Sequence, residues 1–240
     1  MNVTHLTRDE WGADASLPHR GYTHDRSGVP VLERKTDLII HHTVMVDNDS
    51  TKNVWETLDE VKVQMRRLQT IRPDLGIDVP YNEVWFLMDD FTMIACEGRG
   101  VGRTGAHTHG FNTIGLGVAF QANFQIVGLP HPFELWTPSI EARVRQLRAE
   151  VPNLVTVGGH WEYPNQSTVC PGAYLRHPNR LDQIKAMVGG DDMVLAEENR
   201  ERMNRASVML KLTSIAQAGA KPTGLELWWA RAVLDAMEAK

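Results

Sequence analysis

Hydrophobic residues recur with a helical period in two parts of the chain. Within residues 53–71 they are spaced alternately by four and three positions, which places one set on a single helix face: Val54, Leu58, Val61, Met65 and Leu68. A second segment opens at Thr137-Pro138, ends at Pro152, and aligns another set: Ile140, Val144, Leu147 and Val151. Each pattern predicts an amphipathic helix that covers one side of a sheet.

Short hydrophobic runs elsewhere predict strands. Residues 37–41, 114–120 and 155–159 are apolar or glycine-containing runs next to polar residues. Residues 82–88 and 92–97 flank the polar pair Asp89-Asp90, where the chain can reverse, and so predict a β-hairpin. Because strands alternate with helices, the sequence predicts an α/β layer structure.

A domain boundary is predicted at residues 189–192, Gly-Gly-Asp-Asp, where backbone freedom coincides with poor burial. Residues 1–188 then form the main domain. Residues 193–218 and 225–240 are rich in helix-forming residues on either side of a break, which predicts a C-terminal helical segment of unknown role. Its Trp228-Trp229 pair could face a partner, although packing within the segment is the favoured interpretation.

Composition and charge narrow the range of partners. The 240 residues are 42% hydrophobic and 23% charged, as in a folded globular protein. A net charge of −5 without a Lys/Arg cluster argues against nucleic-acid binding. The first eleven residues are polar where a secretory signal needs an apolar stretch, and no later run has membrane-spanning length, so we expect a protein made in the cytoplasm.

The two cysteines need separate explanations. Without a secretory signal, a disulfide between Cys96 and Cys170 is disfavoured, and we expect two independent thiols. Cys96 lies in a hydrophobic arm of the predicted hairpin, which is typical of a small buried apolar residue.

Candidate metal ligands lie at the ends of predicted strands. His41 ends the first strand, His160 follows the last, and Cys170 comes ten residues later. A catalytic zinc takes three such ligands and leaves a fourth position open. The spacing is looser than in structural zinc sites, so it does not by itself separate ligands from ordinary histidines. Because adjacent strand residues point to opposite faces, His41 and His42 cannot easily share one metal.

Five short motifs occur in a fixed order: Leu38-Ile-Ile-His-His-Thr43, Gly105-Ala-His107, Asn112-Thr-Ile-Gly115, Gly159-His160 and Thr168-Val-Cys-Pro-Gly172. In this order they resemble the type 2 N-acetylmuramoyl-L-alanine amidases, the family of peptidoglycan recognition proteins and phage endolysins. The resemblance extends to Arg8-Asp-Glu-Trp-Gly-Ala13, Pro80-Tyr81 and Glu97-Gly-Arg99, and covers residues 7–184. It implies a central mixed β-sheet flanked by helices.

The resemblance also implies a reaction. It implies zinc-dependent hydrolysis of the amide between N-acetylmuramic acid and L-alanine in bacterial peptidoglycan, with the metal ligands His41, His160 and Cys170. Tyr81 and Thr168 match catalytic positions beside the metal, where hydroxyl groups can donate to the negative charge that develops on the amide oxygen.

Two further residues match the family's substrate groove. The resemblance places His107 and Asn112 there, where imidazole and amide groups can hydrogen-bond sugar or peptide atoms. A competing interpretation treats His107 and His109 as a metal-binding pair on one strand face. Another makes Cys170 a nucleophile, which is disfavoured because a nearby metal would hold its thiolate.

The sequence departs from the family pattern in ways that bear on its biology. Residues 159–162 read Gly-His-Trp-Glu instead of Gly-His-Arg-Asp, and residues 160–170 are slightly longer than expected. Residues 43–49 lack the cysteine found in animal recognition proteins. We therefore expect a phage endolysin that acts at the wall after the membrane is breached. A non-catalytic peptidoglycan-binding module, or an assembly protein that uses the C-terminal segment, are the alternatives.

Overall fold

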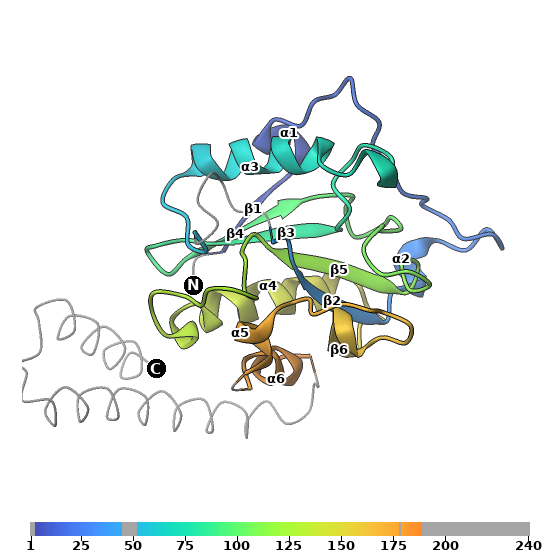
Figure 1. Cartoon of the computed structure of the whole chain (residues 1–240). Coiled ribbons are helices and arrows are strands. Elements are labelled where there is room, and N and C mark those ends of the chain that lie inside the picture. The colour runs from blue at the N-terminus through green and yellow to red at the C-terminus, as the bar shows by residue number, and fades with distance from the viewer. Residues whose placement is uncertain (1–2, 45–51, 178, 189–240) are drawn as a thin grey trace, which may run out of the picture. The chain divides into compact units, whose positions relative to one another are not determined.

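The computed structural model describes residues 3–44, 52–177 and 179–188. Its centre is a six-stranded sheet in the order β1-β4-β3-β5-β2-β6 (Figure 1). The strands are β1 (Val3–Leu6), β2 (Asp37–His42), β3 (Glu83–Leu87), β4 (Met93–Glu97), β5 (Gly115–Phe120) and β6 (Thr156–Gly159). Only the β3–β4 hairpin is antiparallel, and the other neighbours are parallel. The predicted α/β fold with a mixed sheet is confirmed.

Helices cover both sides of the sheet (Figure 1). The helices are α1 (Arg8–Trp11), α2 (Val31–Arg34), α3 (Leu58–Thr70), α4 (Thr137–Glu150), α5 (Ala173–Arg176) and α6 (Arg180–Ala186), with single 3-10 turns at Pro73–Leu75, Phe133–Leu135 and His160–Glu162. Helices α1 and α3 lie on one side, and α4, α5 and α6 lie on the other. Each side has its own cluster of buried side chains. None of the helices in the described ranges is long and apolar enough to cross a bilayer.

The two long helices differ in how closely they follow the predicted pattern. The four residues aligned in the second pattern are all fully buried: Ile140, Val144 and Leu147 in α4, and Val151 directly after it. Helix α3 is shorter than predicted, because Thr57 and Glu60 form a capping box that begins the helix at Leu58. Leu58 itself is 43% exposed, so its predicted place on the buried face was wrong.

Strand β1 was missed in the sequence because only two of its four residues, Val3 and Leu6, are hydrophobic. It is an edge strand that pairs only with β4, and Leu6 is its one buried residue. An edge strand has one neighbour and little buried surface, so hydrophobic alternation gives no signal. The short helices α1, α2, α5 and α6 were also missed, because seven residues or fewer are too short for a helical period to stand out.

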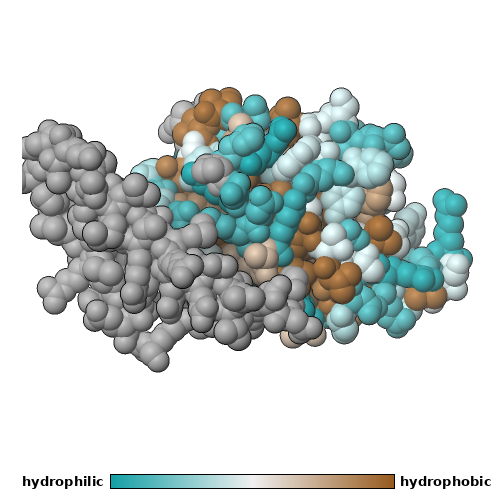
Figure 2. Space-filling view, turned by 90° about the horizontal axis from the view of Figure 1, so that it is seen from below, coloured by the Kyte–Doolittle hydropathy of each residue, from teal (hydrophilic) through white to brown (hydrophobic). Residues whose placement is uncertain are grey.

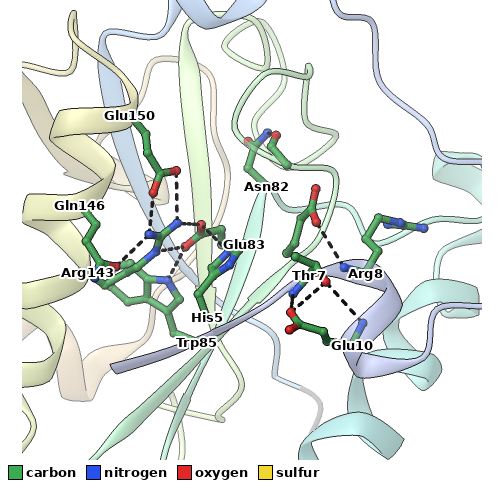
Figure 3. Close-up of polar contacts among 12 residues, drawn as sticks. His5, Thr7, Arg8, Glu10, Asn82, Glu83, Trp85, Arg143, Gln146 and Glu150 are labelled. Carbon is green, nitrogen blue, oxygen red and sulfur yellow. Dashed lines mark hydrogen bonds and ion pairs between the residues drawn. The ribbon is translucent and has the colours of Figure 1, made fainter. Parts of the chain in front are cut away.

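A buried ion pair fastens α4 to the sheet. Glu83 on β3 and Arg143 on α4 form a bidentate pair with side chains 1% and 3% exposed (Figure 3). Trp85 Nε1 donates to Glu83 at 2.9 Å, and Arg143 also donates to Glu150 at 2.8 Å. Burial alone would raise the pKa of Glu83, but hydrogen bonds from His5 and Arg143 and the guanidinium charge hold it below its usual value.

Part of the predicted organisation lies outside the described residues. The boundary at residues 189–192, the C-terminal helical segment at 193–240 and its Trp228-Trp229 pair all remain predictions. Seen from below, the described part of the surface mixes hydrophilic areas with smaller hydrophobic ones (Figure 2).

Candidate metal centre

The sheet register brings two histidines together. Strands β2 and β6 run parallel, and Ile40 pairs with Gly159. The next residue of the chain in each case is therefore a histidine, His41 within β2 and His160 directly after β6, at the carboxyl ends where parallel sheets commonly build their sites. Their ring centroids lie 4.5 Å apart.

Cys170 reaches the same place through a loop that requires glycine. Gly172 has a φ of +97°, and a Cβ there would lie 2.5 Å from the Phe124 carbonyl carbon, so the loop packs backbone to backbone against the chain after β5. The Cys170 carbonyl accepts from Trp161 N at 3.1 Å. Its Sγ lies 3.6 Å from His41 Nδ1 and accepts from the backbone N of His42 at 3.4 Å.

The three ligand atoms converge. One ligand atom from each of His41, His160 and Cys170 lies within 4.8 Å of the others. Zinc bonds of about 2.0–2.1 Å to nitrogen and about 2.3 Å to sulfur, at a tetrahedral angle, separate the two atoms by about 3.6 Å. That value matches the observed separation of 3.6 Å between His41 Nδ1 and Cys170 Sγ. The donor set and its spacing therefore fit a tetrahedral metal ion.

Burial keeps the cluster uncharged when no cation is present. The pKa of His41 is lowered well below its usual value by burial and by neighbouring histidine charges, and burial also lowers the pKa of His160. Burial raises the pKa of the Cys170 thiol to about 12. A bound cation reverses this preference for the thiol, because it stabilises a thiolate ligand directly. A thiol with so high a pKa also argues against the cysteine-nucleophile interpretation.

Strand alternation separates the two adjacent histidines as predicted. Residues Leu38 and Ile40 of β2 face the α4 side, in the larger buried cluster. His41 is one position out of phase with them and joins the metal-ligand cluster, whereas His42 does not. His42 is buried, and its Nδ1 has no hydrogen-bond partner among the described residues.

The predicted catalytic residues lie at the cluster. The ring of Tyr81, just before β3, is centred 5.2 Å from the His41 ring. Burial, then the charge of Cys170, raise the pKa of the Tyr81 hydroxyl, which therefore stays protonated. Thr168 accepts a hydrogen bond from Cys170 N at 3.1 Å, which leaves its hydroxyl proton available for another acceptor.

The predicted substrate-binding residues have structural contacts in this structure. His107 is buried, and its Nδ1 lies 3.2 Å from His41 Nε2. Gly117 permits this position, since a Cβ there would lie 2.3–2.5 Å from the His107 ring. The Asn112 Oδ1 accepts from the backbone N of both His107 and Thr108, at 2.8 and 3.1 Å. Contact with a substrate stays a prediction for both residues.

The competing His107–His109 metal pair is not supported. Both residues lie in a loop instead of a strand, His107 is buried and His109 is exposed. Within the part of the chain that the structure describes, the one metal-ligand cluster contains neither residue. Cys96 is fully buried within β4 and is a free thiol, as is Cys170, so the prediction of two independent thiols is confirmed.

Two residues at the cluster were missed in the sequence. Thr108 Oγ1 lies 3.3 Å from His41 Nε2, and Gln166 Oε1 lies 3.1 Å from His160 Nε2. Thr108 directly follows a family motif, which was the available signal. Gln166 lies within the stretch that departs from the family pattern, so no motif marked it.

Comparison with known proteins gives the family. No family model matches the chain. One peptidoglycan-recognition protein of Drosophila melanogaster, of the SB type, is 30% identical over 138 residues, which span 58% of this chain and 69% of that protein. The chain belongs to the peptidoglycan-recognition protein family. Peptidoglycan-recognition protein SA of the same species is 34% identical over 87 residues, which span 36% of this chain and 38% of that protein.

Solved structures of peptidoglycan-recognition proteins share the fold. Drosophila PGRP-LB superposes with a TM-score of 0.56 at 19% identity, covering 75% of this chain and 96% of PGRP-LB. Drosophila PGRP-SA gives a TM-score of 0.54 at 22% identity, covering 73% and 92% of the two chains. A mutant of PGRP-LB in complex with tracheal cytotoxin also gives 0.54, at 19% identity, covering 71% and 89%.

The family departures after His160 have local structural contacts. The Trp161 ring packs so closely on the end of β6 that a Cβ on Gly159 would lie 2.0 Å from it, and the Arg176 guanidinium lies 4.8 Å from the centre of a Trp161 ring. Glu162 accepts from Gly159 N at 2.7 Å and pairs with Lys185 on α6 at 2.7 Å. These substitutions therefore fasten the His160 turn to β6 and α6.

Proposed function

We propose that this peptidoglycan-recognition protein is a zinc-dependent amidase that hydrolyses the bond between N-acetylmuramic acid and L-alanine in bacterial peptidoglycan. The observation that carries the proposal is the convergence of His41, His160 and Cys170 within 4.8 Å. A module that only binds peptidoglycan has no need for a thiol and two imidazoles at this spacing.

Zinc suits this set of ligands better than the hard cations do. Two imidazoles and a thiolate are ligands of zinc, whereas calcium and magnesium take oxygen ligands. Three protein ligands leave the fourth tetrahedral position for the reaction. A zinc ion held there would supply Lewis acidity and a nucleophile at neutral pH.

The side chains around the metal ligands would act on the amide itself. As the carbonyl carbon is attacked, negative charge develops on its oxygen, and donors already in place lower the barrier. The Tyr81 hydroxyl is such a donor, because its raised pKa keeps it protonated. Thr168 is fixed by the hydrogen bond from Cys170 N and can donate its own proton from that position.

We further propose that the enzyme serves as a phage endolysin, made in the host cytoplasm. The absence of a cysteine at residues 43–49, where animal recognition proteins have one, supports this origin. The test is expression in bacteria. Cells should keep growing until the membrane is permeabilised and then lyse, and lysis without permeabilisation, or none at all, would contradict the role.

Digestion of purified peptidoglycan tests the amidase activity. Native protein, chelated protein and Cys170→Ser are incubated with the same wall preparation, and the fragments are analysed by mass. Native protein alone should release free lactyl carboxylates and new L-alanine amino termini. Intact wall with native, zinc-loaded protein would refute the activity, and binding to that wall without cleavage would favour the non-catalytic module.

A further inference from the structure

In the segment between His160 and Cys170, one side chain contacts both the His160 ring and the carbonyl of His109. Gln166 lies there, half-buried, and its amide makes three side-chain hydrogen bonds. We propose that Gln166 is a positioning residue, which fixes the tautomer of His160 so that Nδ1 is the metal-binding atom. This inference rests on the proposed zinc site.

The orientation of the Gln166 amide follows from its partners. Its Nε2 lies 2.9 Å from the His109 carbonyl oxygen and 3.1 Å from the Pro164 carbonyl oxygen. Carbonyl oxygens only accept, so this end of the amide must be the NH2 group. The other end is therefore Oε1, and it faces His160.

The tautomer of His160 follows from the orientation of that amide. Gln166 Oε1 lies 3.1 Å from His160 Nε2 and can only accept. Nε2 therefore carries the proton, and the lone pair of the neutral ring is on Nδ1. Metal-binding histidines commonly donate their second ring N–H to such a partner, which fixes ring orientation and tautomer.

The same side chain links two loops around the metal ligands. Gln166 binds the carbonyl of His109, and the residue before it, Thr108, contacts His41 Nε2 at 3.3 Å. The loop with Thr108 and His109 thus contacts Nε2 of His41 directly, through Thr108. The same loop contacts Nε2 of His160 indirectly, through Gln166.

Three variants test the role of Gln166 by zinc affinity, measured by competition with a chelator. Gln166→Leu removes the acceptor at similar size and should weaken binding by about 10–100-fold. Gln166→Glu keeps an acceptor for His160 but loses both donors, and should lose less affinity than the leucine variant. Gln183→Leu is the matched control, since that half-buried amide donates to Glu134 on another element, and it should bind zinc like the native protein.

Nitrogen NMR of the His160 ring in the metal-free protein gives a second readout. The native ring should be protonated at Nε2, and Gln166→Leu should show a mixture of tautomers while unfolding at nearly the native temperature. A native protein that binds no zinc would refute the zinc site, while the NMR would still test the tautomer. Unchanged affinity and tautomer in Gln166→Leu, or tighter zinc binding, would overturn the role of Gln166.

Discussion

The Glu83–Arg143 pair and the His41–His160–Cys170 cluster both hold polar side chains in largely buried positions at one sheet. They differ because the ion pair contains two opposite charges and the cluster does not. The ion pair supplies its own opposite charges, and hydrogen bonds from Trp85 and to Glu150 complete it. In the cluster, burial lowers the histidine pKa values and raises that of the thiol. Three groups that burial keeps neutral therefore converge there.

The difference distinguishes a polar pair that is complete in itself from a set of candidate metal ligands. A buried charge is tolerated when its partner is present, and such a pair is complete without a ligand. In the proposed zinc site, a cation from solution would complete the converging imidazole and thiol groups, which burial keeps neutral. Burial alone would not distinguish the two sites. They are distinguished by their charges, which are opposite in the ion pair, and by the convergence of neutral ligand atoms in the cluster.

Removal of one metal ligand should produce the largest functional effect. His160→Ala and Cys170→Ser should each lose zinc binding and reduce amidase activity to background, because two protein ligands do not hold a catalytic zinc. Metal content and peptidoglycan digestion measure this. His24→Ala, at an exposed histidine in another loop, is the control. Full activity in either ligand variant would show that the cluster is not the catalytic centre.

Breaking the ion pair should instead reduce stability. Arg143→Met leaves the Glu83 carboxylate buried without its counter-charge, and should lower the free energy of unfolding by about 3–5 kcal/mol. The double variant Glu83→Leu/Arg143→Met should recover part of that loss. Chemical denaturation measures both proteins. A single variant that loses less than about 1 kcal/mol would mean that solvent reaches Glu83.

Tyr81→Phe should affect the reaction without affecting the metal. Loss of one preorganised donor to the developing oxyanion typically lowers kcat by about 10²-fold. Zinc affinity should stay at the native value, because the hydroxyl is not a ligand. Steady-state kinetics on a soluble muropeptide, together with chelator competition, separate the two quantities. An unchanged kcat would exclude Tyr81 as a donor.

Acidification should produce a gradual loss of stability in the metal-free protein. Burial lowers the pKa of His42 to about 4, and those of His41 and His107 are also depressed. The unfolded chain, with histidine pKa values near 6.5, binds more protons in this range. Stability should therefore be full above about pH 6.5 and fall toward pH 4. Denaturation at several pH values measures it, and a flat profile would contradict neutral buried histidines.

Hydrophobic patterns within short stretches of sequence predicted several elements of the fold. Strand β2, the β3–β4 hairpin and α4 have clear hydrophobic periods, and the ordered motifs pointed to the three candidate metal ligands that converge in the structure. Strand β1 was missed because an edge strand needs few hydrophobic residues. The Glu83–Arg143 pair depends on how α4 docks, and 60 positions separate its members.

The contacts of Thr108 and Gln166 could not be predicted for a similar reason. They depend on the paths of two loops that meet only in the folded chain, and no period in the sequence encodes such paths. The sequence named the ligands of the candidate site, and the structure added the groups that orient them.

Cobalt(II) titration of the metal-free protein tests most directly whether the cluster is completed by a cation. We expect one cobalt per chain, with the intense visible absorption of a four-coordinate ion and a near-ultraviolet sulfur-to-cobalt charge-transfer band that disappears in Cys170→Ser. Stoichiometric binding of zinc should displace it. No saturable binding, or a charge-transfer band that persists in Cys170→Ser, would contradict the metal centre.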